Sequence, residues 1–132
     1  MLNMNYNDFL TRQQQIEKLS IAEQKNFYEQ ILKKKYDKTE VRILASFYYG
    51  QLFYQEGNFR KTIEIIEPII VDYQSYPYTP KLLSCFNLIG VATHCETEYN
   101  VSRFFYETAL KIAMENDEKY YYAFEYNNIA LT

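Results

Sequence analysis

Small residues recur at a constant interval in the last two thirds of this 132-residue chain. Gly50, Gly90 and Ala130 follow one another at intervals of 40 residues. Bulkier positions keep the same interval, and the pairs are Phe59 with Tyr99, and Ile69–Ile70 with Ala109–Leu110. A fixed period of this length indicates one structural unit used more than once, each copy burying its apolar face against the next. The spacing therefore predicts a repeat fold.

The unit is clearest between residues 43 and 70. Gly50 lies inside an apolar run with helical spacing, and a second such run begins at Phe59. Between the runs stand Gly57 and Asn58, which accept a positive φ at low cost and commonly end helices. The stretch predicts a helix, a tight turn and an antiparallel helix, with Gly50 where the two backbones approach closely.

The same signals predict an all-α chain of about seven helices packed as successive antiparallel hairpins. Ser20 and Glu23 form a capping-box pattern, and Thr79 before Pro80 is a strong helix start. Pro68 predicts a bend or an irregular last turn, because proline removes a helical hydrogen bond. In the first half of the chain, the expected helices span about 5–19, 20 to near Tyr36, 39–56, and 59 to 72 or 73. In the second half they span about 80 to 96 or 97, and 99 or 100 to 116. The last helix is expected to be capped by Asp117 and to be still running at Thr132.

Composition and charge narrow the class of protein. Hydrophobic residues make up 48% of the chain, which disfavours disorder. The net charge of −3, with acidic and basic residues mixed, argues against nucleic-acid binding by this segment. No apolar run approaches the ~18 residues of a membrane span, and no signal peptide is visible, so we expect no membrane insertion.

The spacing of the two cysteines indicates whether the protein is in a reducing or an oxidising compartment. Cys85 and Cys95 lie ten residues apart on one expected helix. That separation is a rise of about 15 Å, which is too long for a disulfide between them. We therefore expect a reduced, cytoplasmic protein or segment.

The small residue in a first helix, the Gly57–Asn58 turn and the aromatic Phe59 after it resemble the tetratricopeptide repeat (TPR) family, in a long variety with a period of 40 residues. The resemblance covers residues 39–132 well and 5–36 poorly. It implies an α-α superhelix, a TPR-like solenoid. Its expected parts are an N-terminal hairpin that is a cap or degenerate repeat (1–38), repeat 1 (39–78), repeat 2 (79–116) and the first helix of an incomplete third repeat (117–132).

The chain departs from the family pattern in three places. Thr62 and Ser102 replace the usual alanine of the second helix, and Thr97–Glu98 replaces the second turn. Pro68 lies inside a helix rather than after it. These departures bear on local helix ends rather than on the fold.

The long-period form is similar to TPR segments of bacterial signalling proteins, including those that precede diguanylate cyclase (GGDEF) domains. The resemblance implies a non-catalytic module that binds a protein or peptide, uses no cofactor, and serves as the sensing or scaffolding segment of a larger regulator. The last helix lacks a hairpin partner, so we expect a part of a longer protein, where a downstream catalytic domain is an open alternative.

Two other functions compete with this interpretation. A structural oligomerisation element would associate with itself through the last helix and bind no small ligand. An enzyme built on helical hairpins would need convergent titratable groups, and a single histidine with no catalytic motif disfavours it.

In the TPR family the first helix of each hairpin lines a concave face. The family positions carried over to this chain are Leu44, Phe47, Gln51, Tyr54 and Gln55, then Ser84, Asn87, Val91, His94 and Cys95, then Phe124, Asn127 and Leu131. The expected ligand- or peptide-binding residues among them are Gln51, Tyr54, Asn87, His94 and Asn127. Two amides one period apart can hold an extended peptide backbone, because each offers a donor and an acceptor. The alternative is that each asparagine bonds only to a neighbouring helix.

The run His94-Cys95-Glu96 is the one cluster that suggests a metal or a nucleophile. Consecutive helical residues point about 100° apart, so the three side chains cannot share one ion. A Cys–His nucleophilic pair also needs a third, orienting group and a pocket. We therefore expect no metal site and no catalytic residue.

Overall fold

The computed structural model of the chain describes residues 4–34 and 38–132. These residues form α-helices and one short 3-10 helix, with no β-strand among them. The expected all-α class is confirmed. The helices are α1 Tyr6–Ile16, α2 Ile21–Leu32, α3 Glu40–Gln55, α4 Phe59–Val71, η1 Tyr73–Ser75, α5 Pro80–Cys95, α6 Tyr99–Glu115 and α7 Tyr120–Ala130. None of these helices combines the length and the apolar character needed to cross a bilayer.

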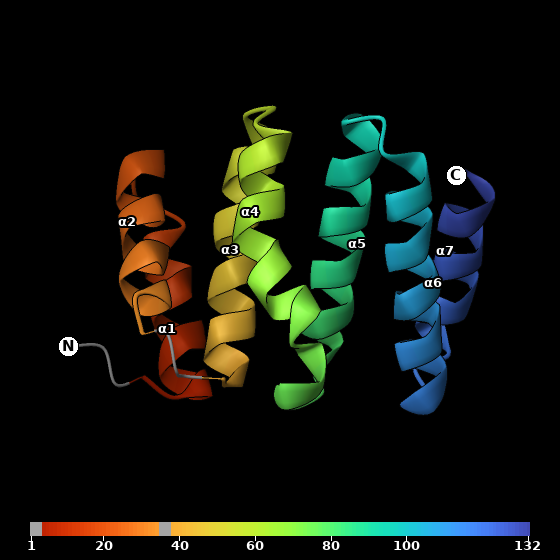
Figure 1. Cartoon of the computed structure of the whole chain (residues 1–132). Helices are drawn as coiled ribbons and strands as arrows, with labels where there is room; N and C mark the ends of the chain where they lie inside the picture. Colours follow the sequence, from red (N-terminus) through yellow and green to blue (C-terminus); the bar gives the residue numbers. More distant parts are fainter. Residues whose placement is uncertain (1–3, 35–37) are drawn as a thin grey trace.

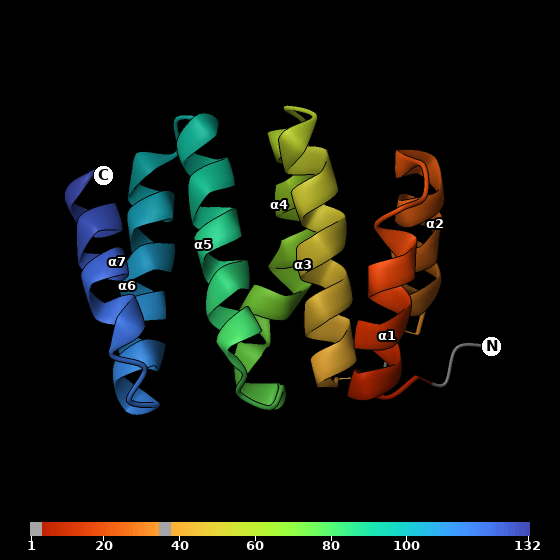
Figure 2. The same cartoon turned by 180° about the vertical axis from the view of Figure 1, so that it is seen from behind.

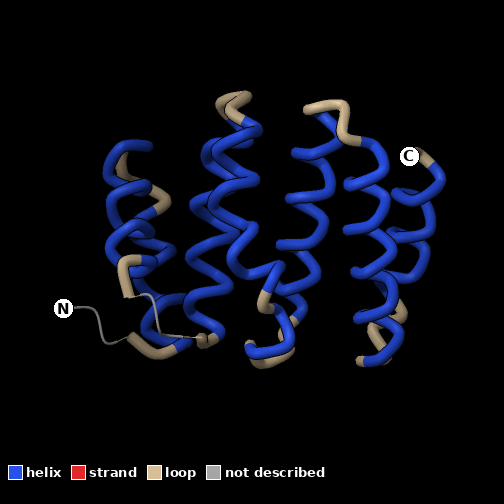
Figure 3. The backbone as a smooth tube through the Cα atoms, in the orientation of Figure 1, coloured by secondary structure: helices blue, strands red, loops and turns tan. Residues whose placement is uncertain are grey.

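The helices stand side by side in two layers. Figures 1 and 2 show α1, α3, α5 and α7 on one side of the molecule and α2, α4 and α6 on the other. The turns after α3, α4, α5 and α6 alternate between the two ends of the molecule (Figure 3), so these consecutive helices run antiparallel. Each described helix contacts the next in sequence, and α3 also contacts α5. We refer to the surface formed by α1, α3, α5 and α7 as the odd-helix face.

Two helix starts follow the predicted capping chemistry. The Ser20 hydroxyl accepts a hydrogen bond from the Glu23 backbone N–H at 3.2 Å, and the Glu23 carboxylate accepts one from the Ser20 N–H, which completes a capping box. Thr79 caps α5 by accepting from the Lys81 N–H, with Pro80 at the first helical position. The end of α2 was expected near Tyr36; the helix ends at Leu32, and Tyr36 lies outside the described residues.

Helices α3 and α5 end in the same way, one period apart. Gly57 has a φ of 80° and Thr97 a φ of 61°. The next backbone N–H in each turn bonds back to the carbonyl five residues earlier, Asn58 to Phe53 and Glu98 to Thr93, both at 2.9 Å. This is the Schellman arrangement, and it satisfies carbonyls that a helix end leaves free.

The turn between α6 and α7 corrects one prediction. Asp117 was expected to cap the last helix, but its φ of 53° makes it the left-handed residue that ends α6, with the Glu118 N–H bonded to the Ala113 carbonyl at 2.8 Å. The cap position of α7 falls at Lys119, which makes no side-chain capping bond. A left-handed residue cannot also hold the extended conformation of an N-cap. The helix also ends at Ala130, short of Thr132.

Pro68 lies inside α4, which continues to Val71. Figure 1 shows α4 bending in its second half toward α5, as expected for a proline that removes one helical hydrogen bond. Asp72 follows as the C-cap, and η1 carries the chain toward α5. The first of the two predicted outcomes, a bend, is therefore the one observed.

The two helical glycines lie at close contacts within their hairpins, as predicted. A Cβ on Gly50 would lie 3.0 Å from Ile66 Cδ1 on α4, and a Cβ on Gly90 would lie 2.5 Å from the Tyr106 ring on α6. Ile66 and Tyr106 are themselves one 40-residue interval apart. The period in the sequence thus corresponds to a repeated helix–helix contact.

Buried hydroxyl groups connect the two helices of each hairpin at Thr62 and Ser102. Thr62 Oγ1 donates to the Gly50 carbonyl at 2.9 Å, and Ser102 Oγ donates to the Gly90 carbonyl at 2.7 Å. Both hydroxyls are fully buried, so each needs a partner. The two bonds tie the helices of each hairpin together at the same point of the repeat.

The core has two parts. One cluster of buried residues joins α3, α4, α5 and α6, and includes Ile43, Ile66, Leu83 and Ile89. The other packs α1 and α2 onto α3, with Phe9 and Tyr28 at its centre. Helices α1 and α2 therefore pack onto α3 through an apolar cluster that is separate from the first one.

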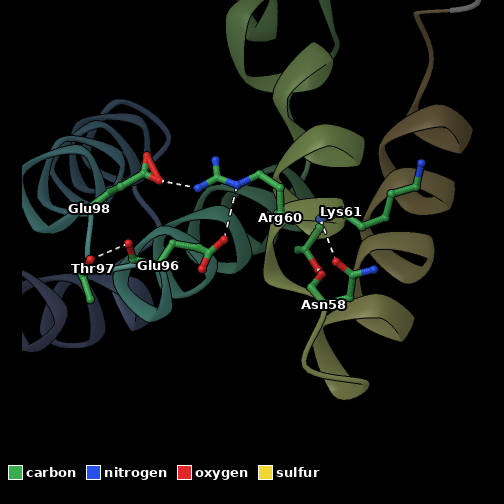
Figure 4. Close-up of polar contacts among 7 residues, drawn as sticks. Asn58, Arg60, Lys61, Glu96, Thr97 and Glu98 are labelled. Atoms are coloured by element: carbon green, nitrogen blue, oxygen red, sulfur yellow. Dashed lines mark hydrogen bonds and ion pairs between the residues drawn. The ribbon is translucent and has the colours of Figure 1, made fainter.

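Neighbouring hairpins are also joined at their turns. Arg60 at the start of α4 pairs with Glu96 (3.3 Å) and Glu98 (2.9 Å) in the α5–α6 turn, as Figure 4 shows. At the position equivalent to Glu98, Asn58 instead caps its own helix by accepting from the Lys61 N–H. The Arg60 pairs are exposed and screened by solvent, so they add little to stability.

Candidate functional site

A pocket of about 490 Å³ lies on the odd-helix face between α3, α5 and α7. Its lining residues share a helical spacing of three or four positions on each helix, which places them on one face of that helix. They are Phe47, Gln51, Tyr54 and Gln55 from α3, Ser84, Asn87, Leu88 and Val91 from α5, and Tyr120, Tyr121 and Phe124 from α7.

The described lining contains no charged side chain. Five aromatic rings form its walls, and two glutamines, one asparagine and one serine supply the polar groups. Burial raises the pKa of Tyr54, and the nearby Cys95 thiol acts in the same direction, so the phenol remains a donor at neutral pH. Burial also raises the pKa of Tyr121, against which the Ser84 hydroxyl acts. The pocket therefore offers aromatic contact and neutral hydrogen-bonding groups.

A buried carboxylate lies next to this pocket. Glu125 on α7 is 0% exposed, and neither of its carboxylate oxygens has a hydrogen-bond partner among the described residues. The Asn87 amide oxygen on α5 is also buried and unpartnered there. Burial raises the pKa of Glu125 to about 7, while the Asn87 and Asn128 amides lie close enough to act against that shift without forming a bond of normal geometry.

Glu125 was missed by sequence reasoning. A glutamate in the run YYYAFEYNNIA suggests a solvated position, because charged side chains are rarely fully buried. One signal was available: Glu125 follows Tyr121 by four residues, which places both on the same stripe of the helix. That stripe faces the neighbouring helices.

The structure brings together three of the five predicted binding residues. Gln51, Tyr54 and Asn87 line the pocket. Asn127 is exposed on α7 outside the pocket lining, and His94 is half-buried with its ring edge-on to Tyr99 at 4.9 Å between centroids. The 40-residue interval placed Asn127 in the same row as Asn87, but the α7 residues that line the pocket are Tyr120, Tyr121 and Phe124.

Other carried-over positions are divided in the same way. Phe47, Gln55, Ser84, Val91 and Phe124 lie in the pocket lining. Leu44 is a correction, because it is 3% exposed and belongs to the core that α1 and α2 form with α3. Cys95 and Leu131 are exposed and outside the lining.

The cysteines and the possible metal ligands were located as well. Both cysteines are free, and burial raises the pKa of the Cys85 thiol to about 12, which leaves it un-ionised at neutral pH. Within residues 4–34 and 38–132, no three His, Cys, Asp or Glu side chains are grouped to hold a metal ion.

A larger hollow of about 740 Å³ lies on the opposite side, between α4, α5 and α6. Its walls include Ile70, Phe86 and Phe104, and the charged Glu107 and Lys111 lie among its lining residues. No buried polar atom without a partner belongs to its described lining. The pocket on the odd-helix face is the better candidate for a binding site. Its lining combines aromatic rings with polar side chains, and one lining residue, Asn87, has a buried oxygen without a hydrogen-bond partner among the described residues.

Comparison with known proteins gives no match: no family model matches the chain, and neither does any curated protein or solved structure.

Proposed function

We propose that this segment is a non-catalytic, TPR-like binding module, the sensing or scaffolding part of a larger bacterial signalling or regulatory protein in the cytoplasm. Its ligand is a peptide or an extended segment of a partner protein, held on the odd-helix face. The observation that supports this most is the pocket between α3, α5 and α7, where neutral amides and aromatic rings from three helices face one space.

The chemistry of the lining favours an uncharged ligand segment. With no cation in the described lining, the pocket has no clamp for phosphate or carboxylate groups. Gln51 offers a donor and an acceptor that suit peptide C=O and N–H groups, and the Asn87 amide nitrogen adds a donor, since the Asn87 oxygen is buried. The rings of Phe47, Tyr54 and Phe124 suit apolar side chains of the same segment.

The oligomerisation alternative also has an observation in its favour. Two large apolar side chains in the region of α7 are exposed: Tyr126 on α7 (57%) and Leu131, the residue after the helix (69%). Exposed apolar area of this kind often marks a contact surface. The two functions are compatible, because these residues lie outside the pocket lining.

Peptides selected from a random display library against the whole chain test the binding function. The affinity of a labelled selected peptide is measured by fluorescence anisotropy for the parent, for Gln51→Ala and for the pair Gln51→Ala, Asn87→Ala. We expect about 2–10-fold weaker binding for the single change, as for one lost hydrogen bond, and at least about tenfold for the pair.

Gln14→Ala is the matched control, since Gln14 is an exposed glutamine on α1, outside the pocket lining. It should leave the affinity unchanged. Selected peptides that bind the pocket variants as well as the parent would show that the odd-helix face is not the binding surface.

A further inference from the structure

Glu125 is a buried group that ordinary packing does not explain. An ionised carboxylate with no donor or cation beside it is costly to bury, whereas the neutral acid carries an O–H that can donate. Glu125 is fully buried, and both of its oxygens lack a partner in the described part of the chain. The site therefore suits the protonated form.

The Asn87 side chain on α5 offers an acceptor for that proton. The Asn87 amide oxygen is buried without a donor, and the Asn87 amide is one of two that act on the Glu125 carboxyl. A carboxylic acid O–H that donates to this oxygen would satisfy one buried atom on each helix. Without the proton, the Asn87 amide oxygen and both Glu125 oxygens would be buried acceptors, and the Asn87 oxygen would have no donor from Glu125.

The surroundings compensate a charge on Glu125 only in part: the Asn87 and Asn128 amides act to lower its pKa, and burial, the larger cause, outweighs them. The titratable groups that interact with Glu125 are the phenols of Tyr106 on α6 and Tyr121 on α7, both neutral near pH 7. Helix α5 contributes the uncharged Asn87 amide, and α7 itself contributes Asn128. Among the groups of the described chain that shift its pKa, none is a cation.

We propose that Glu125 is a proton switch that controls the binding pocket: the protonated side chain holds α7 against α5 by donating to Asn87, and its ionisation releases α7. The proton passes to water when the helix loosens. The consequence for a ligand rests on the proposed function, because α7 supplies Tyr120, Tyr121 and Phe124 of the pocket wall.

Two features make α7 responsive to a single group. It lies at the edge of the layer, where α6 is its main packing partner. No side chain caps its first turn. Burial places the pKa of Glu125 at about 7 against 4.5 unperturbed, so ionisation falls near neutral pH.

The sign of the pH dependence follows from the raised pKa. Between pH 4.5 and about 7 the unfolded chain has lost the proton while the folded chain keeps it, so stability falls as pH rises. The stabilisation is complete below the unfolded pKa, is lost by the folded pKa, and is constant above it. The folding equilibrium should change on the order of a hundredfold across this window.

The test uses the unliganded whole chain, so its result does not depend on whether a peptide binds. Hydrogen exchange, corrected for the intrinsic effect of pH, is followed by mass spectrometry at pH 5.5 and pH 8.0. We expect α7 to lose protection at the higher pH while α3 and α5 keep theirs. In Glu125→Gln, whose amide can donate to Asn87 without a charge, protection of α7 should be the same at both pH values.

Glu115→Gln, an exposed position on α6, is the control and should behave as the parent does. A direct measurement covers the case in which Glu125→Gln does not fold. Carboxyl NMR of the parent with labelled glutamate should show one glutamate that titrates near pH 7 and vanishes from that range on unfolding. Titration of every glutamate below pH 5.5, or equal pH dependence of α7 in the parent and Glu125→Gln, would overturn the proposal.

Discussion

Gly50 and Gly90 occupy equivalent positions of the repeat but differ in how much space surrounds them. The Cβ of an alanine at 50 would meet the flexible end of Ile66 at 3.0 Å, whereas at 90 it would lie 2.5 Å from the ring of Tyr106. Tyr106 is 3% exposed, so its ring has little room to move. The two glycines therefore differ in how strictly the fold requires them.

Substitution by alanine should separate the two positions. Gly90→Ala should lower the free energy of unfolding by about 1–3 kcal/mol, because the new methyl group overpacks the α5–α6 contact. Gly50→Ala should be close to neutral, since higher helix propensity, worth up to about 1 kcal/mol, offsets a milder contact. Urea unfolding followed by circular dichroism measures both, and an equal loss in the two variants would contradict the difference in packing.

At the scale of the element, the end of α5 carries a residue that does not suit its conformation. Thr97 is β-branched and has a φ of 61°, a region that L-residues other than Asn, Asp and Gly rarely enter. Its counterpart one period earlier is Gly57, where a Cβ would meet nothing within 4 Å. The two turns therefore share one backbone geometry, but only the turn at Thr97 places a β-branched residue in the left-handed region.

Thr97→Gly should raise the free energy of unfolding by a few tenths to about 1 kcal/mol, because relief of the left-handed strain exceeds the added entropy of glycine in the unfolded chain. Gly57→Ala, the reverse change at the equivalent site, should lower it by about 1 kcal/mol. Thermal unfolding of both variants provides the measurement. A destabilised Thr97→Gly would mean that the threonine side chain contributes more than its strain costs.

The elements also show what the sequence could predict. Helix starts at Ser20 and Thr79 were correct because capping is a local interaction between residues two or three apart. Asp117 was misassigned because aspartate and asparagine occur at two kinds of position. They are common N-caps, and they also tolerate the left-handed conformation in which a helix ends. Glu125 could not be found, since its burial depends on how α7 packs against α5 and α6 rather than on its neighbours in sequence.

At the scale of the whole molecule, the odd-helix face collects only part of the predicted site. Gln51 and Asn87 come together because α3 and α5 are true copies, related by the same glycine contact and the same hydroxyl bond. Asn127 falls outside although α7 starts one period after α5, because the pocket lies between α7 and the other two helices and the α7 residues that line it are Tyr120, Tyr121 and Phe124. The 40-residue interval thus predicts a side chain's position only as far as the contacts of the repeat recur.

The exposed side of α7 leads to a prediction about assembly. Tyr126 and Leu131 are 57% and 69% exposed, and burying them against a second molecule would remove apolar surface from water. We expect self-association that increases with concentration in sedimentation velocity and is weakened by Tyr126→Asp. Val71→Asp is the control, because Val71 is 77% exposed but lies on α4, in the other layer. A parent chain that stays monomeric at high concentration would exclude association through α7.

The hydroxyl bonds to the glycine carbonyls have a spectroscopic consequence. The chain has only three glycines: Gly50 and Gly90 each accept a side-chain hydrogen bond in one hairpin, and Gly57 lies exposed in a turn. Glycine labelled with carbon-13 at the carbonyl would therefore place one reporter at the helix–helix contact of each of two hairpins, and a third in the exposed turn between α3 and α4. Because an added hydrogen bond polarises a carbonyl, loss of the Thr62 or Ser102 bond would shift one resonance and leave the other in place. A single isotope label would then reveal which hairpin opens first as the protein unfolds.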